Sequence, residues 1–234
     1  MSGMIDFQIF KNRAEASIAA ASLLAELLRD SLNKEPHSRA SLVVSGGSTP
    51  GACFEHLSTE RMDWSRVTVI PSDERWVPAS HPDSNEGLVR SRLLHGKAGA
   101  GQFLSFFREG INAEQSPPMI EQDLLALSHP FSVSLLGMGQ DGHFASLFPD
   151  YKELEKALDP QGEPLCIVVQ TAGSPHLRIS LTLSALLVSR HIVLLIFGDE
   201  KRTVFEAASR GGSNYPIESL LNHSSVPVTV IWAP

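Results

Sequence analysis

Short apolar runs alternate with amphipathic stretches along most of the chain. Several runs are continuously apolar, as strands covered on both faces must be. The runs that predict strands are residues 5–10, 41–47, 67–70, 131–137, 165–170, 191–198 and 226–232. The spacing of apolar positions between them predicts helices at 13–32, 50–59, 84–95, 117–128 and 199–209, the last with Asp199 as its N-cap. This alternation predicts an α/β fold with a mostly parallel, doubly wound sheet and helices on both faces.

One polar stretch interrupts this pattern. Residues 72–84, SDERWVPASHPDS, contain Pro78 and Pro82, which disfavour regular structure, so we predict a long irregular loop there. A polar loop of this length in a compact domain is more often functional than accidental. We find no internal repeat and no interdomain linker, and we therefore expect a single domain spanning residues 1–234.

Composition narrows the protein class. Hydrophobic residues make up 42% of the 234 residues and charged residues 19%, and no apolar segment approaches the ~20 residues that span a bilayer. The N-terminal stretch has no apolar core, since Asp6 and Lys11 interrupt it, so we expect no secretory signal and a cytoplasmic location. Cys53 and Cys166 lie far apart, without metal-ligand or redox spacing, and are expected to be buried without a chemical role.

The formal net charge of -7 disfavours a polyanionic partner, and no basic run offsets it. We therefore expect neither nucleic acid nor membrane as a partner. A small anion remains compatible with this charge, because a few cationic side chains and backbone N–H groups can hold it locally. Whether the protein is a monomer or a homodimer is left open.

Polar segments follow three of the predicted strands. They are SGGSTP at 45–50, SDERW at 72–76 and GMGQDGH at 137–143. Ligands bind at the carboxyl ends of the strands in sheets of this kind, so we expect the three segments to open on the same edge.

The segment at 137–143 satisfies the G-x-G-x-x-G pattern of dinucleotide binding. That pattern requires a long helix after the third glycine, whereas Pro149 would interrupt one here, and it usually follows the first strand of the fold. A nicotinamide cofactor is therefore disfavoured. His143, two residues after Asp141, is instead a candidate general base with a supporting carboxylate. The alternative is that His143 caps a helix.

The segment at 45–50 resembles an anion cradle. Gly46 and Gly47 allow close approach of the backbone, Ser48 and Thr49 offer hydroxyl and amide donors, and Pro50 suits a helix start. No Gly-Lys-Ser/Thr follows, so it is not a Walker loop, and proline replaces the last glycine of a nucleophile elbow. A tight turn with an N-cap is the alternative.

The segment at 72–76 carries two carboxylates, Asp73 and Glu74, next to Arg75. An arginine can bind a carboxylate or a phosphate through a bidentate fork. A surface salt bridge between Arg75 and either carboxylate is the alternative. Two further cations, Arg178 and Lys201, follow predicted strands or turns, and each taken singly is expected to be a solvated surface charge.

Together these segments resemble the 6-phosphogluconolactonase family. The resemblance runs through SGGSTP, SDERWVP, LLGMGQDGHFASLFP, PHLRISLTL and GDEK, in order along most of the chain. It implies a modified Rossmann-like fold, shared with glucosamine-6-phosphate deaminases and sugar-phosphate sensor domains. It also implies hydrolysis of 6-phospho-D-glucono-1,5-lactone to 6-phosphogluconate in the pentose phosphate pathway, without a cofactor or metal.

The resemblance also implies roles for individual residues. His143 would activate water for attack on the lactone carbonyl with Asp141 as its supporting carboxylate, and Arg75 would hold the reacting end or the oxyanion. Asp73 would lie near the sugar hydroxyls. The residues that would hold the 6-phosphate are Gly46, Gly47, Ser48, Thr49, Arg178 and Lys201.

Two rival functions share this type of sequence. The deaminase branch of the resemblance has Asn-Glu-Pro where this chain reads Ser146-Leu147-Phe148-Pro149, and it lacks an arginine that matches Arg75. A non-catalytic sugar-phosphate sensor would bring a helix-turn-helix module, for which the chain has no room. The absence of Asn-Glu-Pro and the presence of Arg75 both favour the lactonase over the deaminase.

Overall fold

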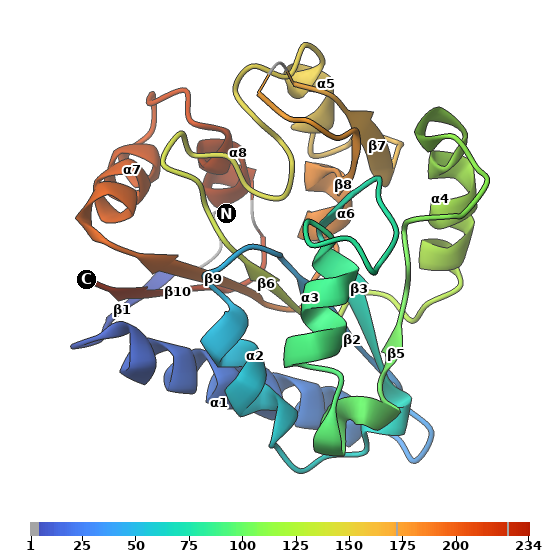
Figure 1. Cartoon of the computed structure of the whole chain (residues 1–234). Helices are drawn as coiled ribbons and strands as arrows, with labels where there is room; N and C mark the ends of the chain where they lie inside the picture. The colour runs from blue at the N-terminus through green and yellow to red at the C-terminus, as the bar shows by residue number, and fades with distance from the viewer. Residues whose placement is uncertain (1–4, 172, 224) are drawn as a thin grey trace.

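The structure of the chain is a computed structural model that describes residues 5–171, 173–223 and 225–234 (Figure 1). Within these residues, the main sheet has seven strands, and every neighbouring pair is parallel. In spatial order they are β1 (Ile5–Ile9), β10 (Val228–Ala233), β9 (Ile192–Phe197), β6 (Val133–Leu136), β2 (Ala40–Val44), β3 (Val67–Pro71) and β5 (Gln102–Phe103).

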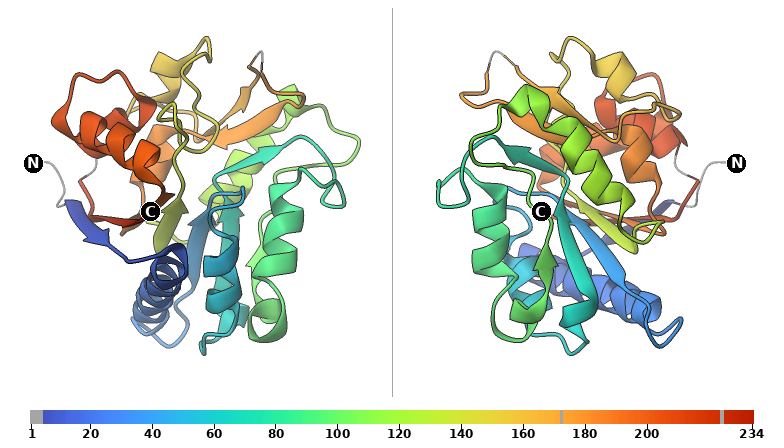
Figure 2. Two further views of the ribbon diagram at one scale, coloured as in Figure 1. Left: turned by 60° about the vertical axis from the view of Figure 1, so that its left-hand side comes forward. Right: turned by 90° about the vertical axis from the view of Figure 1, so that its right-hand side faces the viewer.

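Helices cover both faces of this sheet (Figures 1 and 2). One face carries α1 (Arg13–Leu32), α2 (Gly51–Ser58) and α3 (Asn85–Arg92). The other carries α4 (Pro117–Leu125), α5 (Leu154–Ala157), α6 (Leu183–Leu187), α7 (Asp199–Arg210) and α8 (Pro216–His223). Short 3-10 helices occupy Trp64–Arg66, Gly96–Ala100 and Ala113–Gln115. The predicted doubly wound α/β fold is confirmed.

Alternation along the strands divides the interior into two hydrophobic cores. In β2, Leu42 and Val44 pack toward α1 and α2, whereas Val43 faces the opposite core. β9 behaves in the same way, with Val193 packed on the first face and Leu194 on the second. Successive side chains of a strand point to opposite faces, so continuously apolar strands require a layer of helices on each side.

The longest helix agrees with its sequence pattern. α1 begins and ends at the predicted residues, and Asn12 caps it by accepting a hydrogen bond from the backbone N–H of Glu15 at 2.9 Å. The alanines and leucines of one face lie buried: Ala16, Ala20, Ala21, Leu24, Ala25, Leu28 and Leu32. None of the helices in the described part of the chain is long and apolar enough to cross a membrane.

The polar stretch at 72–84 is not wholly irregular, contrary to our prediction. Its first residues form β4 (Asp73–Arg75), which joins β8 (Arg178–Leu181) and β7 (Cys166–Val169) in a separate antiparallel sheet. β7 therefore lies outside the main sheet to which its apolar pattern assigned it. β5 and β8 were not predicted, because both are short and β8 is preceded by polar residues.

Three helix starts differ from the prediction by one residue, among them that of α3, which begins at Asn85 after Ser84 as its N-cap. Gly198, with φ of 89°, takes the N-cap position of α7, and Asp199 is the first helical residue. A positive φ favours glycine at this cap, while the Asp199 carboxylate still lies near the positive end of the helix dipole. Pro50 precedes α2 at the cap position, and the helix begins at Gly51.

Both cysteines are buried, as predicted, and neither forms a disulfide. Burial raises the pKa of the Cys53 thiol to about 12. Burial, with Glu121 nearby, raises the pKa of the Cys166 thiol to about 12 as well. Neither side chain supplies a thiolate nucleophile at neutral pH.

Candidate active site

The site lies at the point where the strand order reverses. From β2 the chain continues to β3 and β5 on one side, whereas β6, β9 and β10 lie on the other. Parallel sheets bind ligands at such a switch point, outside the carboxyl ends of the strands. The loops after β2 and β6 meet there, and the Ser45 hydroxyl joins them by accepting a hydrogen bond from the backbone N–H of Gly137 at 3.2 Å.

A pocket of about 250 Å³ opens at this edge. The segments after β2, β3 and β6 all contribute to its wall, as the sequence predicted. All predicted site residues except Asp141 line it: Gly46, Gly47, Ser48, Thr49, Asp73, Arg75, His143, Arg178 and Lys201. The sequence therefore identified a set of residues that the fold brings together.

His143 and Asp141 form a direct pair. The imidazole Nδ1 lies 2.6 Å from Oδ1 of Asp141, and the two side chains are 29% and 48% exposed. A carboxylate at Nδ1 favours the tautomer with a proton on Nδ1 and leaves the lone pair of Nε2 free to accept another. The His143 ring also packs against Phe148, with the ring centroids 4.2 Å apart. This arrangement is compatible with a general base that acts through Nε2.

The glycine pattern at 137–142 serves this histidine. A Cβ on Gly139 would overlap the His143 ring and the Asp141 carboxylate, so the middle glycine allows both side chains to fold back over the turn. No helix begins between 137 and 150, a range that the structure describes throughout. The reading of His143 as a helix cap is therefore wrong, and the helix N-terminus that would hold a dinucleotide pyrophosphate is missing at this turn.

The loop after β2 forms the opposite wall. A Cβ on Gly46 would overlap the amide of Asn85, which packs directly on the loop. Ser48 and Thr49 precede α2, so their hydroxyl and backbone N–H groups lie near the positive end of that helix. The loop offers donors suited to an anion, as the sequence indicated.

Arg75 and Arg178 are brought together by the small antiparallel sheet. They are directly opposite in the register of β4 and β8, and both line the pocket. The Nη1 group of Arg75 donates a hydrogen bond of 2.6 Å to the backbone oxygen of Asp83. Among the ion pairs of the described residues, Arg75 joins neither Asp73 nor Glu74, so the surface salt-bridge reading is wrong.

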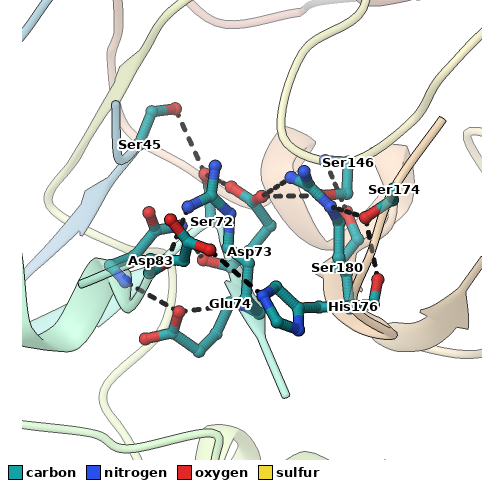
Figure 3. A network of polar contacts seen from close by, with 12 residues as sticks. Ser45, Ser72, Asp73, Glu74, Asp83, Ser146, Ser174, His176 and Ser180 are labelled. Carbon is teal, nitrogen blue, oxygen red and sulfur yellow. Dashed lines mark hydrogen bonds and ion pairs between the residues drawn. The ribbon is translucent and has the colours of Figure 1, made fainter. Parts of the chain in front are cut away.

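Asp73 and serine hydroxyls hold Arg178 in place (Figure 3). Arg178 Nη1 lies 3.7 Å from Asp73 Oδ2, which also accepts a hydrogen bond of 2.6 Å from Ser146. Arg178 Nε donates to Ser174 at 3.1 Å, and its guanidinium lies over the Phe148 ring. Burial lowers the pKa of Arg178, whereas the Asp73 carboxylate acts in the opposite direction.

The Asp73 carboxylate is buried and engaged within the protein. Besides Ser146, it accepts a hydrogen bond of 3.0 Å from Ser72, whose hydroxyl also contacts that of Ser45 at 3.1 Å. A carboxylate with this many internal partners orders the pocket wall and Arg178. Its contact with sugar hydroxyls stays a prediction.

Glu74 has a structural role at the start of α3. Its carboxylate accepts hydrogen bonds from the backbone N–H groups of Arg75, Asn85 and Glu86 at 2.8, 2.8 and 2.6 Å, and it also accepts one from Ser84. The side chain points away from the pocket and is almost wholly buried. Burial raises the pKa of Glu74 to about 7, although the backbone N–H groups oppose this shift.

Lys201 lies in the first turn of α7, at the pocket wall beside Ser48 and Thr49. Burial lowers the pKa of Lys201, and the nearby Arg13 contributes in the same direction. Lys201, Ser48 and Thr49 also line an adjoining groove with Arg13. Cationic groups thus concentrate at this end of the pocket despite the negative charge of the whole chain.

Sequence reasoning missed two residues of this site. Asn85 donates a hydrogen bond of 2.7 Å to the backbone oxygen of Asp73 and packs on Gly46, and Phe148 packs against both His143 and Arg178. Phe148 lies in a segment already singled out and Asn85 directly follows the 72–84 stretch, so proximity to those motifs was an available signal. Their contacts join segments far apart in sequence and cannot be seen from spacing.

The described residues form one cluster of side chains that could bind a metal, and none of its three residues lines the pocket. The cluster consists of His81, Asp83 and His176, and it contacts Arg75 through the backbone oxygen of Asp83. Within the pocket, the groups suited to a phosphorylated substrate are the cationic side chains and the backbone N–H groups of the loop after β2.

Known proteins resemble this chain over its whole length. The model of the family described as glucosamine-6-phosphate isomerases/6-phosphogluconolactonase matches residues 11–232. A 6-phosphogluconolactonase of Pseudomonas aeruginosa is 38% identical over 232 residues, which cover 98% of this chain and 95% of that protein. A relative of the same name from Mesorhizobium japonicum is 37% identical over 98% of this chain and 95% of its own length.

Solved structures with the same name share the fold of this chain. The crystal structure of a 6-phosphogluconolactonase from Shewanella baltica superimposes with a TM-score of 0.92 at 38% identity, covering all of both chains. That of a putative 6-phosphogluconolactonase from Neisseria gonorrhoeae gives a TM-score of 0.88 at 36% identity, covering 99% of this chain and 100% of its own.

Proposed function

The chain belongs to the glucosamine-6-phosphate isomerase/6-phosphogluconolactonase family, and from this we propose that it hydrolyses 6-phospho-D-glucono-1,5-lactone to 6-phosphogluconate with a water activated by His143. The relatives at 37–38% identity carry the name of a lactonase, so the enzyme class is that of the carboxylic ester hydrolases. The reaction is a step of the pentose phosphate pathway.

One observation carries the mechanistic part of this proposal. The His143–Asp141 pair opens on a pocket that also holds Arg75, Arg178 and Lys201. A base, a place for water and several cations suit the attack on a phosphorylated ester. A δ-lactone is already an activated ester, so this set of residues suffices for its hydrolysis.

In the proposed reaction, Nε2 of His143 takes a proton from water as the water oxygen attacks the lactone carbonyl carbon. Asp141 stabilises the imidazolium that forms and fixes the ring. Arg75 stabilises the negative charge that develops on the carbonyl oxygen. When the intermediate collapses, the bond to the ring oxygen breaks and His143 returns its proton to that oxygen, which yields a hydroxyl and a carboxylic acid. The acid then releases its proton to the solvent and leaves as the carboxylate.

The 6-phosphate is proposed to bind the loop of Gly46, Gly47, Ser48 and Thr49 together with Arg178 and Lys201. Backbone N–H groups at the start of α2 and the two cations complement a dianion. Fixing the phosphate at one end orients the carbonyl carbon toward the water at the other, so binding energy lowers the barrier of the chemical step.

The deaminase activity within the same family requires a different residue set. The positions after the histidine segment hold Leu147, buried in the core, and Phe148, packed on His143. Neither supplies the carboxylate that the deaminase branch carries there. The pocket is therefore suited to ester hydrolysis.

The proposal is tested by pH-stat titration of acid released from freshly generated 6-phosphoglucono-δ-lactone, after subtraction of spontaneous hydrolysis. Saturable acid release above the blank, with none from unphosphorylated gluconolactone, is the expected result. A rate equal to the blank would refute lactonase activity and direct the work to ammonia release from glucosamine 6-phosphate.

A further inference from the structure

Three metal-ligand side chains meet outside the pocket, where the loop after β4 approaches the start of β8. The possible ligand atoms of His81, Asp83 and His176 all lie within 4.8 Å of one another. Oδ2 of Asp83 is 3.1 Å from Nε2 of His176 and 3.9 Å from Nδ1 of His81. The two imidazole rings are edge to face with centroids 5.2 Å apart. Figure 3 shows the contact between Asp83 and His176.

We propose that His81, Asp83 and His176 bind a zinc ion, with water completing the coordination. Tetrahedral zinc with bonds of about 2.0–2.1 Å places neighbouring ligand atoms about 3.3 Å apart. The Asp83 carboxylate lies 3.1 and 3.9 Å from the two imidazoles, and all three ligand atoms lie within 4.8 Å of one another, so side-chain rotations can bring them to this spacing. The side chains are 25% to 52% exposed, which leaves an entry path and room for water.

The donor set favours a first-row transition metal over magnesium. Two imidazoles and one carboxylate suit zinc, whereas magnesium prefers an all-oxygen octahedral shell that retains several waters. The His81 Nδ1 atom accepts a hydrogen bond of 3.1 Å from the backbone N–H of Asp83, so Nδ1 carries no proton, as metal ligation requires. Zinc binding at Nδ1 replaces this hydrogen bond, because both use the same lone pair. For His176, zinc binding at Nε2 requires the tautomer with its proton on Nδ1, so no net proton is lost from the neutral ring.

The site would connect two parts of the active-site wall. The backbone oxygen of Asp83 accepts the hydrogen bond from Arg75, and His176 lies two residues before Arg178. A zinc ion here would tie the 76–84 loop to the edge of β8 and hold the backbone on which both arginines depend. This inference concerns metal binding and does not depend on the lactonase mechanism.

Isothermal titration of the metal-free, full-length chain with zinc chloride at pH 7.5 tests the proposal. One site is expected, with affinity at least about tenfold weaker in His81→Gln and in His176→Gln. The matched control is His37→Gln, an exposed histidine elsewhere, which should leave the affinity unchanged. Magnesium chloride should give no binding.

A second comparison separates this cluster from the other histidine–carboxylate pair. His143→Gln should bind zinc like the wild type, and zinc should raise the midpoint of thermal unfolding in both proteins but not in His176→Gln. Undetectable zinc binding by the wild type would overturn the proposal. Wild-type affinity in His81→Gln and His176→Gln, or loss of binding in His143→Gln, would overturn it as well.

Discussion

Arg75 and Arg178 face each other as direct partners in the antiparallel pairing of β4 and β8. Like charges at such positions destabilise a sheet, and the charge of Arg75 adds to the effect of burial in lowering the pKa of Arg178. Asp73 offsets one of the two charges at 3.7 Å, while Arg75 relies on a backbone oxygen. The Nε atom of Arg75 is also buried without a hydrogen-bond partner in the structure. This arrangement favours an anionic ligand between the loops.

Replacement of Arg75 by lysine should lower kcat about 10–100-fold, because a single ammonium cannot reproduce the planar fork that we propose to stabilise the carbonyl oxygen. Initial rates over a range of lactone concentrations give kcat and KM separately. Arg92→Lys, at an exposed ion pair with Glu55, is the control and should behave like the wild type. Wild-type kcat in Arg75→Lys would exclude this role.

His143→Ala should lower kcat by about 10²–10⁴, the range expected for a positioned general base. Asp141→Asn keeps the size of the side chain but removes the charge that orients the ring, so a smaller loss of kcat is expected, with KM little changed. Stopped-time assays corrected for spontaneous hydrolysis would measure both. Activity above a tenth of wild type in His143→Ala would remove the histidine from the role of base.

Gly139→Ala should inactivate the enzyme while the chain remains folded. The added Cβ would overlap the His143 ring and Asp141, so the pair must separate. Gly99→Ala is a suitable control, since its Cβ would meet only the Leu94 backbone oxygen at an ordinary contact distance of 3.8 Å. Circular dichroism and thermal unfolding would establish folding in both variants. An active Gly139→Ala variant would show that the close approach is not required.

Lys201→Met should raise KM about 10–100-fold and change kcat little, because the lysine is assigned to the phosphate and not to the reacting carbonyl. Inhibition by inorganic phosphate should weaken in parallel. Lys156→Met, at a lysine that is 82% exposed, controls for the loss of one positive charge. A fall in kcat with unchanged KM would contradict the assignment.

Glu74 should make stability depend on pH. Because burial raises the pKa of Glu74 from 4.5 to about 7, the folded chain binds its proton more tightly than the unfolded chain does. This contribution to stability is fully present below pH 4.5 and is lost as the pH rises to about 7.

The free energy of unfolding should therefore fall between these pH values relative to that of Glu74→Gln, by an amount on the order of 2 kcal/mol. Urea unfolding of both proteins across this range measures the difference. Parallel pH profiles for the two proteins would indicate that Glu74 is ionised throughout.

The sequence by itself determined the elements that depend on local pattern. The bounds of α1 follow from its apolar spacing, and the strands of the main sheet other than β5 follow from short apolar runs, several of them continuous and stable only between two layers of helices. The pairing of His143 with Asp141 was also accessible, since the two residues are neighbours in one turn.

Only the tertiary structure decided the contacts between distant segments. β4 reads as a polar loop because its three residues include two acids and an arginine, and it becomes a strand only by pairing with β8, about a hundred residues later. That pairing also brings Arg75 opposite Arg178 and places Asp73 in an ion pair with Arg178. The contacts of Asn85 and Phe148 depend on similar long-range packing. Spacing along the chain cannot encode such contacts, because they arise when the folded sheet edges bring separate loops together.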